Sequence, residues 1–271
     1  MTRMEDQGRP GFAANQVLPG VYHIADPMNV FCTLLVGDNQ ALLFDTGYGL
    51  FDVQAYVRTL TDLPLTVLLS HGHHDHACGA TWFEKVLLAK EEIPVCRHYT
   101  RPEQRLRILD QAEKKGLLSI NYDRDAYLTS GAGNLVALEE KEMDLGGMTV
   151  QILPLTGHTA GSLGLFVMPQ KLLLAGDNWN PTTWLFFPEC ETVPRYVQTM
   201  NSLLKLPFAF ALAPHHGQLL PGKRLRQYIR GLNDAAFSSA LPSPIPPYEQ
   251  IHTYVCHPEP ETTFVFDRDK L

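Results

Sequence analysis

Several features that mark common protein classes are missing from this chain of 271 residues. It has no run of eighteen or more apolar residues, which argues against a membrane-spanning helix. Its opening segment, MTRMEDQGRPGFAANQ, holds no apolar stretch of the kind that a secretory signal carries. No block of Lys or Arg stands out, and the formal net charge is −7. An acidic protein repels polyanions, so neither a nucleic-acid nor a membrane partner is expected.

Paired cysteines are also missing. The five cysteines are odd in number and include no C-x-x-C pair, so no disulfide framework is indicated. They are typical of free thiols in a reducing compartment, and we expect a cytoplasmic protein whose partner is a small molecule. The sequence does not indicate the oligomeric state. The cysteines are Cys32, Cys78, Cys96, Cys190 and Cys256.

The chain does have enough apolar residues, 45%, to bury a sizeable core, and its twenty Gly and twenty Pro predict short elements. Short apolar runs alternate with helical patterns, which predicts sheet-rich halves with helices outside. We expect one domain over residues 1–238, of which 1–17 form a polar extension. Residues 239–271 then form a Pro-rich linker and an edge hairpin on the same domain. The predicted strands include residues 21–24, 31–37, 40–47, 63–70, 148–155, 171–177 and 208–214.

The densest polar motif is HGHHDH, which directly follows the apolar run LPLTVLLS. Alternate residues of an extended or tightly turning loop point the same way, so His71 and His73 can share one metal ion. Asp75 and His76 then point toward a second ion. Imidazole and carboxylate are ligands that zinc prefers, and Gly72 lowers steric crowding beside them.

Three later motifs offer the missing ligands, each at the end of a predicted strand. LPLTGHTAGS contains His158, LLLAGDN contains Asp177, and LAPHHGQ contains His215 and His216. A carboxylate can bridge two cations with one oxygen each, which is the role that Asp177 would have. Two metal ions roughly 3.5–4 Å apart can activate a shared water or hydroxide.

The order FDTG, HGHHDH, GHTAGS, GD and HHG resembles the metallo-β-lactamase superfamily over roughly residues 18–237. The resemblance implies an α+β fold, a four-layer αββα sandwich of two mixed β-sheets with the metals at one edge. It implies two divalent ions, with Zn²⁺ expected and Mn²⁺ or Fe²⁺ as alternatives. The implied ligands are His71, His73 and His158 for the first ion, Asp75, His76 and His216 for the second, and Asp177 as the bridge.

The choice of His216 over His215 follows the family's habit of placing the ligand directly before Gly, here Gly217. Asp45 of FDTG matches the family's early Asp, which orients a ligand or its loop without ligating. We expect the surplus His74 to face outward from its loop. Cys78 stands where the family usually has glycine, and we interpret it as a small buried thiol.

The resemblance implies a hydrolase that cleaves an ester, thioester, lactone or phosphodiester of a small molecule. A hydroxide bridging the two metals would attack, and Asp75 is the candidate to take or relay its proton. Asp177 argues against β-lactam hydrolysis, since β-lactamases generally lack this bridge. The aromatic-rich stretch after it predicts an apolar substrate pocket. Its candidate residues are Trp179, Trp184, Phe186, Phe187 and His215.

Two other functions remain open at this point. One is a mononuclear iron thiol or persulfide oxygenase on the same scaffold, held by His71, His158 and Asp177. The retention of the other ligand-type residues weighs against it. The other is a metal-binding protein without turnover, which a complete ligand set with an open water position makes less favoured.

Overall fold

The computed structural model describes residues 11–271, and these form two compact units that meet in sequence at Thr149 and Val150. No helix among residues 11–271 is long and apolar enough to cross a membrane. The predicted polar extension begins outside the described residues, and its remainder differs from the prediction. Residues 13–18 pair with residues 21–25 as an antiparallel strand, so they are part of the sheet.

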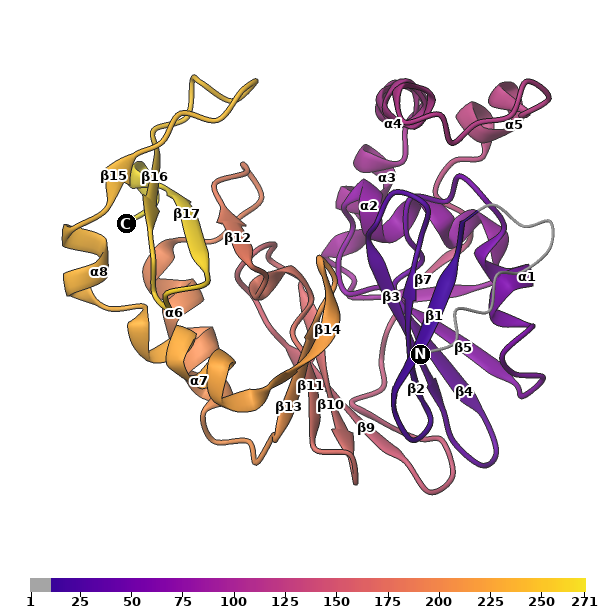
Figure 1. The fold of residues 1–271 in the computed structure, drawn as a ribbon, viewed down its shortest axis with the longest axis horizontal. Helices are drawn as coiled ribbons and strands as arrows, with labels where there is room; N and C mark the ends of the chain where they lie inside the picture. Colours follow the sequence, from indigo (N-terminus) through magenta and orange to yellow (C-terminus); the bar gives the residue numbers. More distant parts are fainter. Residues whose placement is uncertain (1–10) are drawn as a thin grey trace. The chain divides into compact units, whose positions relative to one another are not determined.

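The first unit is built on a sheet whose strands lie in the order of the sequence, β1 to β7 (Figure 1). Strands β1 to β4 are antiparallel neighbours, whereas β4, β5, β6 and β7 run parallel to one another. The predicted strands of this unit are present. The bounds are β1 Ala13–Leu18, β2 Val21–Ala25, β3 Phe31–Val36, β4 Ala41–Phe44, β5 Leu65–Leu68, β6 Val86–Leu88 and β7 Leu135–Ala137, with β8 Glu142–Asp144 after them.

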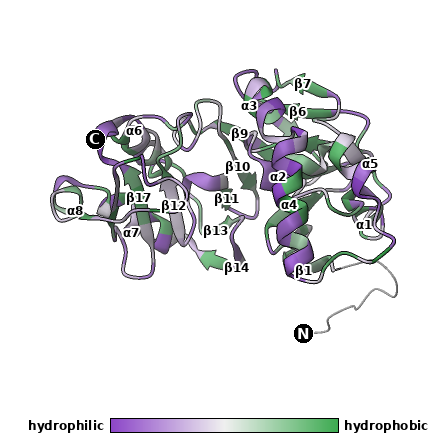
Figure 2. Cartoon of the chain, turned by 90° about the horizontal axis from the view of Figure 1, so that it is seen from above, coloured by the Kyte–Doolittle hydropathy of each residue, from purple (hydrophilic) through white to green (hydrophobic). Residues whose placement is uncertain are grey.

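Helices of the first unit follow the parallel strands. The long helix α4 begins at Pro102, where a missing N–H costs nothing, and buries Ile108, Leu109 and Ala112 on one face. Figure 2 shows the matching alternation of hydrophilic and hydrophobic segments along α4. The bounds are α1 Val53–Val57, α2 His74–Ala77, η1 Cys78–Trp82, α3 Glu92–Tyr99, α4 Pro102–Lys114 and α5 Arg124–Thr129.

The second unit holds a larger sheet with the order β14-β13-β11-β10-β9 and a smaller one with the order β12-β17-β16-β15. Helix α7 packs on β13 and β14 and against α6. The strands are β9 Thr149–Pro154, β10 Leu163–Met168, β11 Leu172–Leu174, β12 Thr182–Leu185, β13 Phe210–Ala213, β14 His216–Pro221, β15 Leu241–Pro242, β16 Thr253–Cys256 and β17 Thr263–Asp267. The helices are η2 Gly176–Asn178, α6 Val193–Leu203, α7 Gly222–Gly231, α8 Asp234–Ser238 and η3 Arg268–Lys270.

The C-terminal hairpin differs from the predicted edge hairpin. Strands β16 and β17 pair antiparallel, but β17 also pairs parallel with β12, and β16 pairs with β15. Both strands therefore lie inside their sheet. The buried rings of Tyr196, Phe264 and Phe266 stack beneath it and join its core to α6.

The topology places polar residues at strand ends in both units. In the first unit Asp45 follows β4 and Ser70 comes two residues after β5, its parallel neighbour. In the second unit Asp177 follows β11 and His215 follows β13, which are also parallel neighbours. Because parallel neighbours end at the same edge of a sheet, each unit gathers its chemistry-bearing side chains at one edge.

Candidate metal centre

The first unit carries its ligand-type residues on the segment between β5 and α2. Suitable ligand atoms of His71 and His73 lie within 4.8 Å of each other, and their ring centroids are 4.6 Å apart. Asp75 Oδ2 lies 3.4 Å from His76 Nε2. Gly72 permits this turn, because a Cβ there would lie 2.4 Å from the backbone nitrogen of Cys96. The segment thus forms two neighbouring pairs of ligand-type side chains.

Asp45 organises this segment with one buried carboxylate. Its Oδ1 accepts the backbone N–H of Ser70 at 2.7 Å, and its Oδ2 accepts the Ser70 hydroxyl at 2.9 Å. The same Oδ2 lies 3.0 Å from Nδ1 of His76. A carboxylate only accepts, so His76 carries a proton on Nδ1, and the neutral ring presents a lone pair on Nε2.

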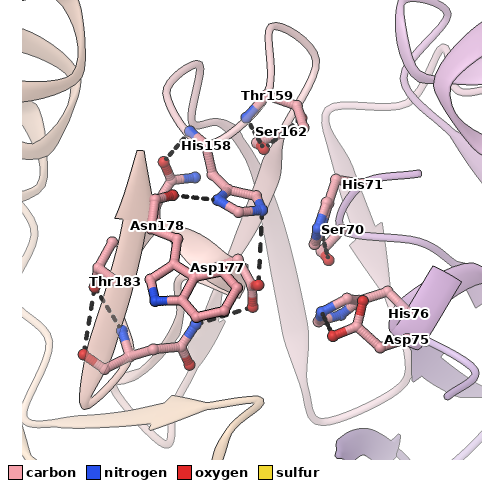
Figure 3. Close-up of polar contacts among 12 residues, drawn as sticks. Ser70, His71, Asp75, His76, His158, Thr159, Ser162, Asp177, Asn178 and Thr183 are labelled. Carbon is pink, nitrogen blue, oxygen red and sulfur yellow. Dashed lines mark hydrogen bonds and ion pairs between the residues drawn. The ribbon is translucent and has the colours of Figure 1, made fainter. Parts of the chain in front are cut away.

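Ser70 transmits the same constraint to His71. Their Oγ and Nδ1 atoms lie 2.9 Å apart. Figure 3 shows the two residues side by side. Since the one proton of the hydroxyl is donated to Asp45, the Nδ1–H of His71 must donate to Ser70 Oγ. His71 then also presents Nε2 as a lone pair. A single carboxylate therefore sets the tautomers of two candidate ligands.

In the second unit, His158 lies in the turn between β9 and β10 and is held by neutral groups. Its backbone N–H donates to Asn178 Oδ1 at 2.9 Å, and its Nδ1 donates to the Trp184 carbonyl at 2.7 Å. In the neutral imidazole these bonds place the lone pair on Nε2 of His158, which lies 3.7 Å from Asp177 Oδ2 (Figure 3).

Asp177 divides its two oxygens between two histidines of the second unit. Oδ2 faces His158, whereas Oδ1 lies 3.3 Å from Nε2 of His215. Asn180 supports both partners, since its Nδ2 donates to Asp177 Oδ1 at 2.9 Å and its Oδ1 accepts the N–H of His215 at 3.3 Å. This division of oxygens suits a carboxylate that serves two cations.

The structure differs from the sequence prediction over the HH pair. It brings His215 to Asp177, whereas His216 begins β14 and its Nδ1 accepts the backbone N–H of Gln218 at 3.2 Å. His215 lies in the turn between β13 and β14, whereas His216 is the first residue of β14. The Gly217 argument from the sequence does not decide which of the two faces Asp177.

The predicted aromatic pocket residues separate into two kinds. Trp179 and Phe186 are each 1% exposed and belong to the hydrophobic core of the second unit. Trp184 is 37% exposed, and the ring of Phe187 meets that of His158 edge-on at 6.0 Å. Phe187 and, through its ring contact with Phe187 at 5.9 Å, Trp184 are thus the aromatics placed beside His158. His215 keeps 36% of its side chain exposed.

His74 and Cys78 each have a structural environment. His74 packs against the rings of Tyr48 and Tyr99 at 5.6 and 6.0 Å, and burial lowers its pKa, so it does not face outward as predicted. Cys78 is fully buried, and burial raises the pKa of its thiol to about 11. At neutral pH Cys78 is therefore a protonated thiol of low reactivity.

Sequence reasoning missed three supporting residues, Ser70, Asn178 and Asn180. Each lies within three residues of a predicted ligand, and each side chain hydrogen-bonds a ligand or the carboxylate beside one. A short polar residue next to a ligand motif was the available signal, but such residues are common in turns.

The ligand-type residues of both units fit divalent metal ions in their chemistry. His71, His76 and His158 each have Nδ1 engaged by a hydrogen bond that leaves Nε2 as the lone pair. This arrangement is typical of metal-binding histidines. The carboxylates of Asp75 and Asp177 add the oxygen ligands that zinc, manganese and iron accept.

Comparisons with known proteins agree with this chemistry. The chain is 28% identical over 163 residues to the probable metallo-hydrolase YqgX of Bacillus subtilis (strain 168), which covers 56% of this chain and 66% of the relative. It is 23% identical over 186 residues to the acyl-coenzyme A thioesterase MBLAC2 of Bos taurus, covering 64% of this chain and 66% of that one. These matches thus span slightly less than two thirds of each relative.

A solved structure shows the fold. The metallo-β-lactamase family protein TTHA1429 from Thermus thermophilus matches with a TM-score of 0.57 and 22% identity, over 82% of this chain and 80% of that one. The predicted fold class is therefore confirmed. The family model of the metallo-β-lactamase superfamily matches residues 25–236, which is most of the sequence. The chain belongs to the metallo-β-lactamase superfamily.

Proposed function

We propose that this chain is a metal-dependent hydrolase that uses two divalent ions to cleave a small molecule, with a carboxylic ester or thioester preferred over a lactone or phosphodiester. One observation carries the proposal: His71, His76 and His158 are all held through Nδ1 with Nε2 as the lone pair. A thioester is favoured because one relative is named as an acyl-coenzyme A thioesterase.

The proposed ligands of the first ion are His71, His73 and His158. Those of the second are Asp75, His76 and His215, in place of the His216 expected from the sequence. Asp177 would give one oxygen to each ion, which its contacts with two different histidines support. Zn²⁺ is the expected metal, with Mn²⁺ and Fe²⁺ as alternatives, because imidazole and carboxylate suit all three.

Two such ions would supply Lewis-acid chemistry, polarising the scissile oxygen and bringing the pKa of water toward neutrality. The chain supplies the rest. Asp75 keeps a carboxylate that is 14% exposed, and we assign it the removal of a proton from the attacking water. Asp45 and Ser70 keep the imidazoles oriented, and Trp184 with Phe187 offers an apolar wall for an acyl group.

The proposal is tested by metal analysis together with a panel of thioesters, esters, lactones, β-lactams and phosphodiesters. We expect two metal equivalents per chain and the highest kcat/KM on a thioester or ester. The Asp177→Ala variant should lose activity by ~100-fold or more and at least one metal equivalent, since even residues that only support ligands contribute 10- to 100-fold. Full activity in that variant, or a single iron with oxygen uptake, would rule out the two-metal hydrolase.

The apolar wall has a separate test. Replacing Trp184 and Phe187 together by Ala should raise KM for long-chain acyl substrates by about tenfold and leave metal content unchanged. Leu241→Ala is the control, because Leu241 is 67% exposed on the same small sheet. Equal kinetics of the double variant and the control would remove these two aromatics from the pocket.

A further inference from the structure

A cavity of about 120 Å³ lies inside the second unit, next to the residues that support Asp177. Trp179 and Asn180 line one part of it and Arg224 another. Asn180 connects it to the candidate metal centre, because the same side chain donates to Asp177 Oδ1 at 2.9 Å. The volume equals that of about four liquid water molecules, which is enough for one small polar group such as an amide.

Two hydrogen-bond donors on the lining residues are buried without a protein partner. Neither Nε1 of Trp179 nor Nε of Arg224 makes a hydrogen bond within residues 11–271. Trp82 provides the contrast, since its Nε1 donates to the Gly49 carbonyl at 3.2 Å. A buried donor without an acceptor is costly, so an acceptor oxygen in this cavity would relieve that cost.

The charges around the cavity limit what that acceptor can be. The Arg224 guanidinium is paired with Glu261 Oε2 at 2.8 Å and with Glu259 Oε2 at 3.1 Å. Two carboxylates against one guanidinium leave a net negative charge, which disfavours a carboxylate or phosphate ligand. Pro181, Ala213 and Leu220 add apolar wall. A neutral group with a carbonyl or hydroxyl oxygen meets both conditions.

We propose that this cavity binds a neutral amide or hydroxyl group of the substrate, with its oxygen accepting the indole N–H of Trp179. The group would be part of the molecule whose ester or thioester is cleaved, held beside His216 and beside Asn180, which donates to Asp177. That assignment to the substrate rests on the proposed hydrolase function. The capacity of the cavity to bind a neutral amide does not, and it can be tested without turnover.

The test uses the indole N–H signals of the metal-loaded, full-length chain in a ¹H–¹⁵N spectrum. The chain has three tryptophans, and Trp82→Phe and Trp184→Phe assign two signals at partly exposed positions, leaving Trp179 by elimination. N-methylacetamide is then titrated in. We expect a saturable downfield shift of the Trp179 signal, no shift of the Trp82 signal, and no response of Trp179 to acetate.

A charge variant completes the experiment. Glu261→Gln removes one carboxylate whose side chain is 73% exposed, so the variant should fold normally. With one carboxylate left against the guanidinium, acetate should now move the Trp179 signal as well. No saturable shift with N-methylacetamide, or an equal shift with acetate in the unaltered chain, would overturn the proposal.

Paired substrates then connect binding to turnover. A thioester with a neutral amide in its thiol part, S-acetyl-N-acetylcysteamine, is compared with ethyl thioacetate, which has none. We expect kcat/KM to be about tenfold higher for the first, and the advantage to disappear in Trp179→Phe. If kcat/KM were equal for the two thioesters while the Trp179 signal still shifted, the cavity would bind an amide but the substrate would not use it. If the Trp179 signal did not shift while the thioesters were still hydrolysed, the amide-binding role of the cavity would be wrong and the proposed hydrolase function would stand.

Discussion

In the first unit a carboxylate holds the segment that carries the candidate metal ligands. In the second unit neutral groups hold the corresponding residues. Asp45 accepts three hydrogen bonds from the segment that carries His71 and His76. In the second unit the amides of Asn178 and Asn180 and the carbonyl of Trp184 position His158, Asp177 and His215. A buried carboxylate imposes a tautomer strongly, whereas amides fix geometry without adding charge.

The difference follows from what each segment must neutralise. The first unit presents four imidazoles within six residues, and an anion behind them favours the ligand tautomers and increases their basicity. The second unit already contains the carboxylate of Asp177. A second buried anion beside it would be repelled, so neutral amides are the compatible support. The two units therefore use opposite means to prepare the same kind of ligand.

The largest expected effect distinguishes the two histidines of the second unit. His215→Ala should remove one metal equivalent, or weaken its binding by ~100-fold or more, because His215 shares Asp177 with the proposed second ion. His216→Ala should keep both equivalents, since it is Nε2 of His215 that lies 3.3 Å from Asp177 Oδ1. Metal analysis after dialysis against a weak chelator measures both variants. The reverse pattern would restore His216 as the ligand.

A smaller effect is expected when the supports are changed and the ligands are kept. Asp45→Asn places an amide N–H₂ against the Nδ1–H of His76. Two donors then face each other, which disfavours the tautomer that presents Nε2 to a metal ion. Zinc affinity should fall by 10- to 100-fold. Asn180→Ala removes one neutral bond to Asp177 and should lower zinc affinity by about tenfold at most.

Competition with a fluorescent zinc chelator gives both affinities, and circular dichroism verifies that each variant folds. If Asn180→Ala weakened binding as much as Asp45→Asn, the contrast between charged and neutral supports would be wrong. Ser70→Ala should fall between the two, since it breaks the link from Asp45 to His71 but leaves the link to His76.

These contrasts show which parts of the site can be predicted from sequence. HGHHDH, His158 and Asp177 stand at the ends of apolar runs, where both the pattern and the chemistry are visible in the residues themselves. The choice between His215 and His216 depends on which side of the chain faces Asp177 where β13 turns into β14, and adjacent residues give no signal for that. Asn178 and Asn180 act through their exact side-chain reach, which polar turn residues in a sequence do not reveal.

The fold also has parts that the sequence predicts and parts that it does not. The strands around the ligand motifs were predictable from short apolar runs, because buried parallel strands are almost continuously apolar. Residues 13–18, AANQVL, form neither a continuous apolar run nor a regular alternation, so the sequence did not predict their pairing with β2. The pairing of β17 with β12 joins segments about eighty residues apart, and local patterns carry no information on such a contact.

The smallest effect concerns pH and a second buried carboxylate of the first unit, Asp26. It accepts the backbone N–H groups of Met28, Val30 and Tyr48, yet burial raises its pKa from 3.8 to about 6. Between these values the folded chain keeps a proton that the unfolded chain releases. The stability that this proton provides is complete at low pH and is lost as pH rises through about 6.

Urea unfolding of metal-free protein at pH 5 and pH 7 measures this loss against Asp26→Asn, which cannot titrate. The unaltered chain should lose about 1 kcal/mol more unfolding free energy than the variant between the two pH values. The amide of the variant also faces the Tyr48 N–H unfavourably, but that cost does not change with pH and cancels in the difference. Parallel pH slopes would show that Asp26 is already ionised at pH 5, and that the three backbone N–H groups outweigh burial. A matched Asn178→Asp variant should make the unfolding free energy depend on pH through the second unit, whose supports are otherwise neutral amides.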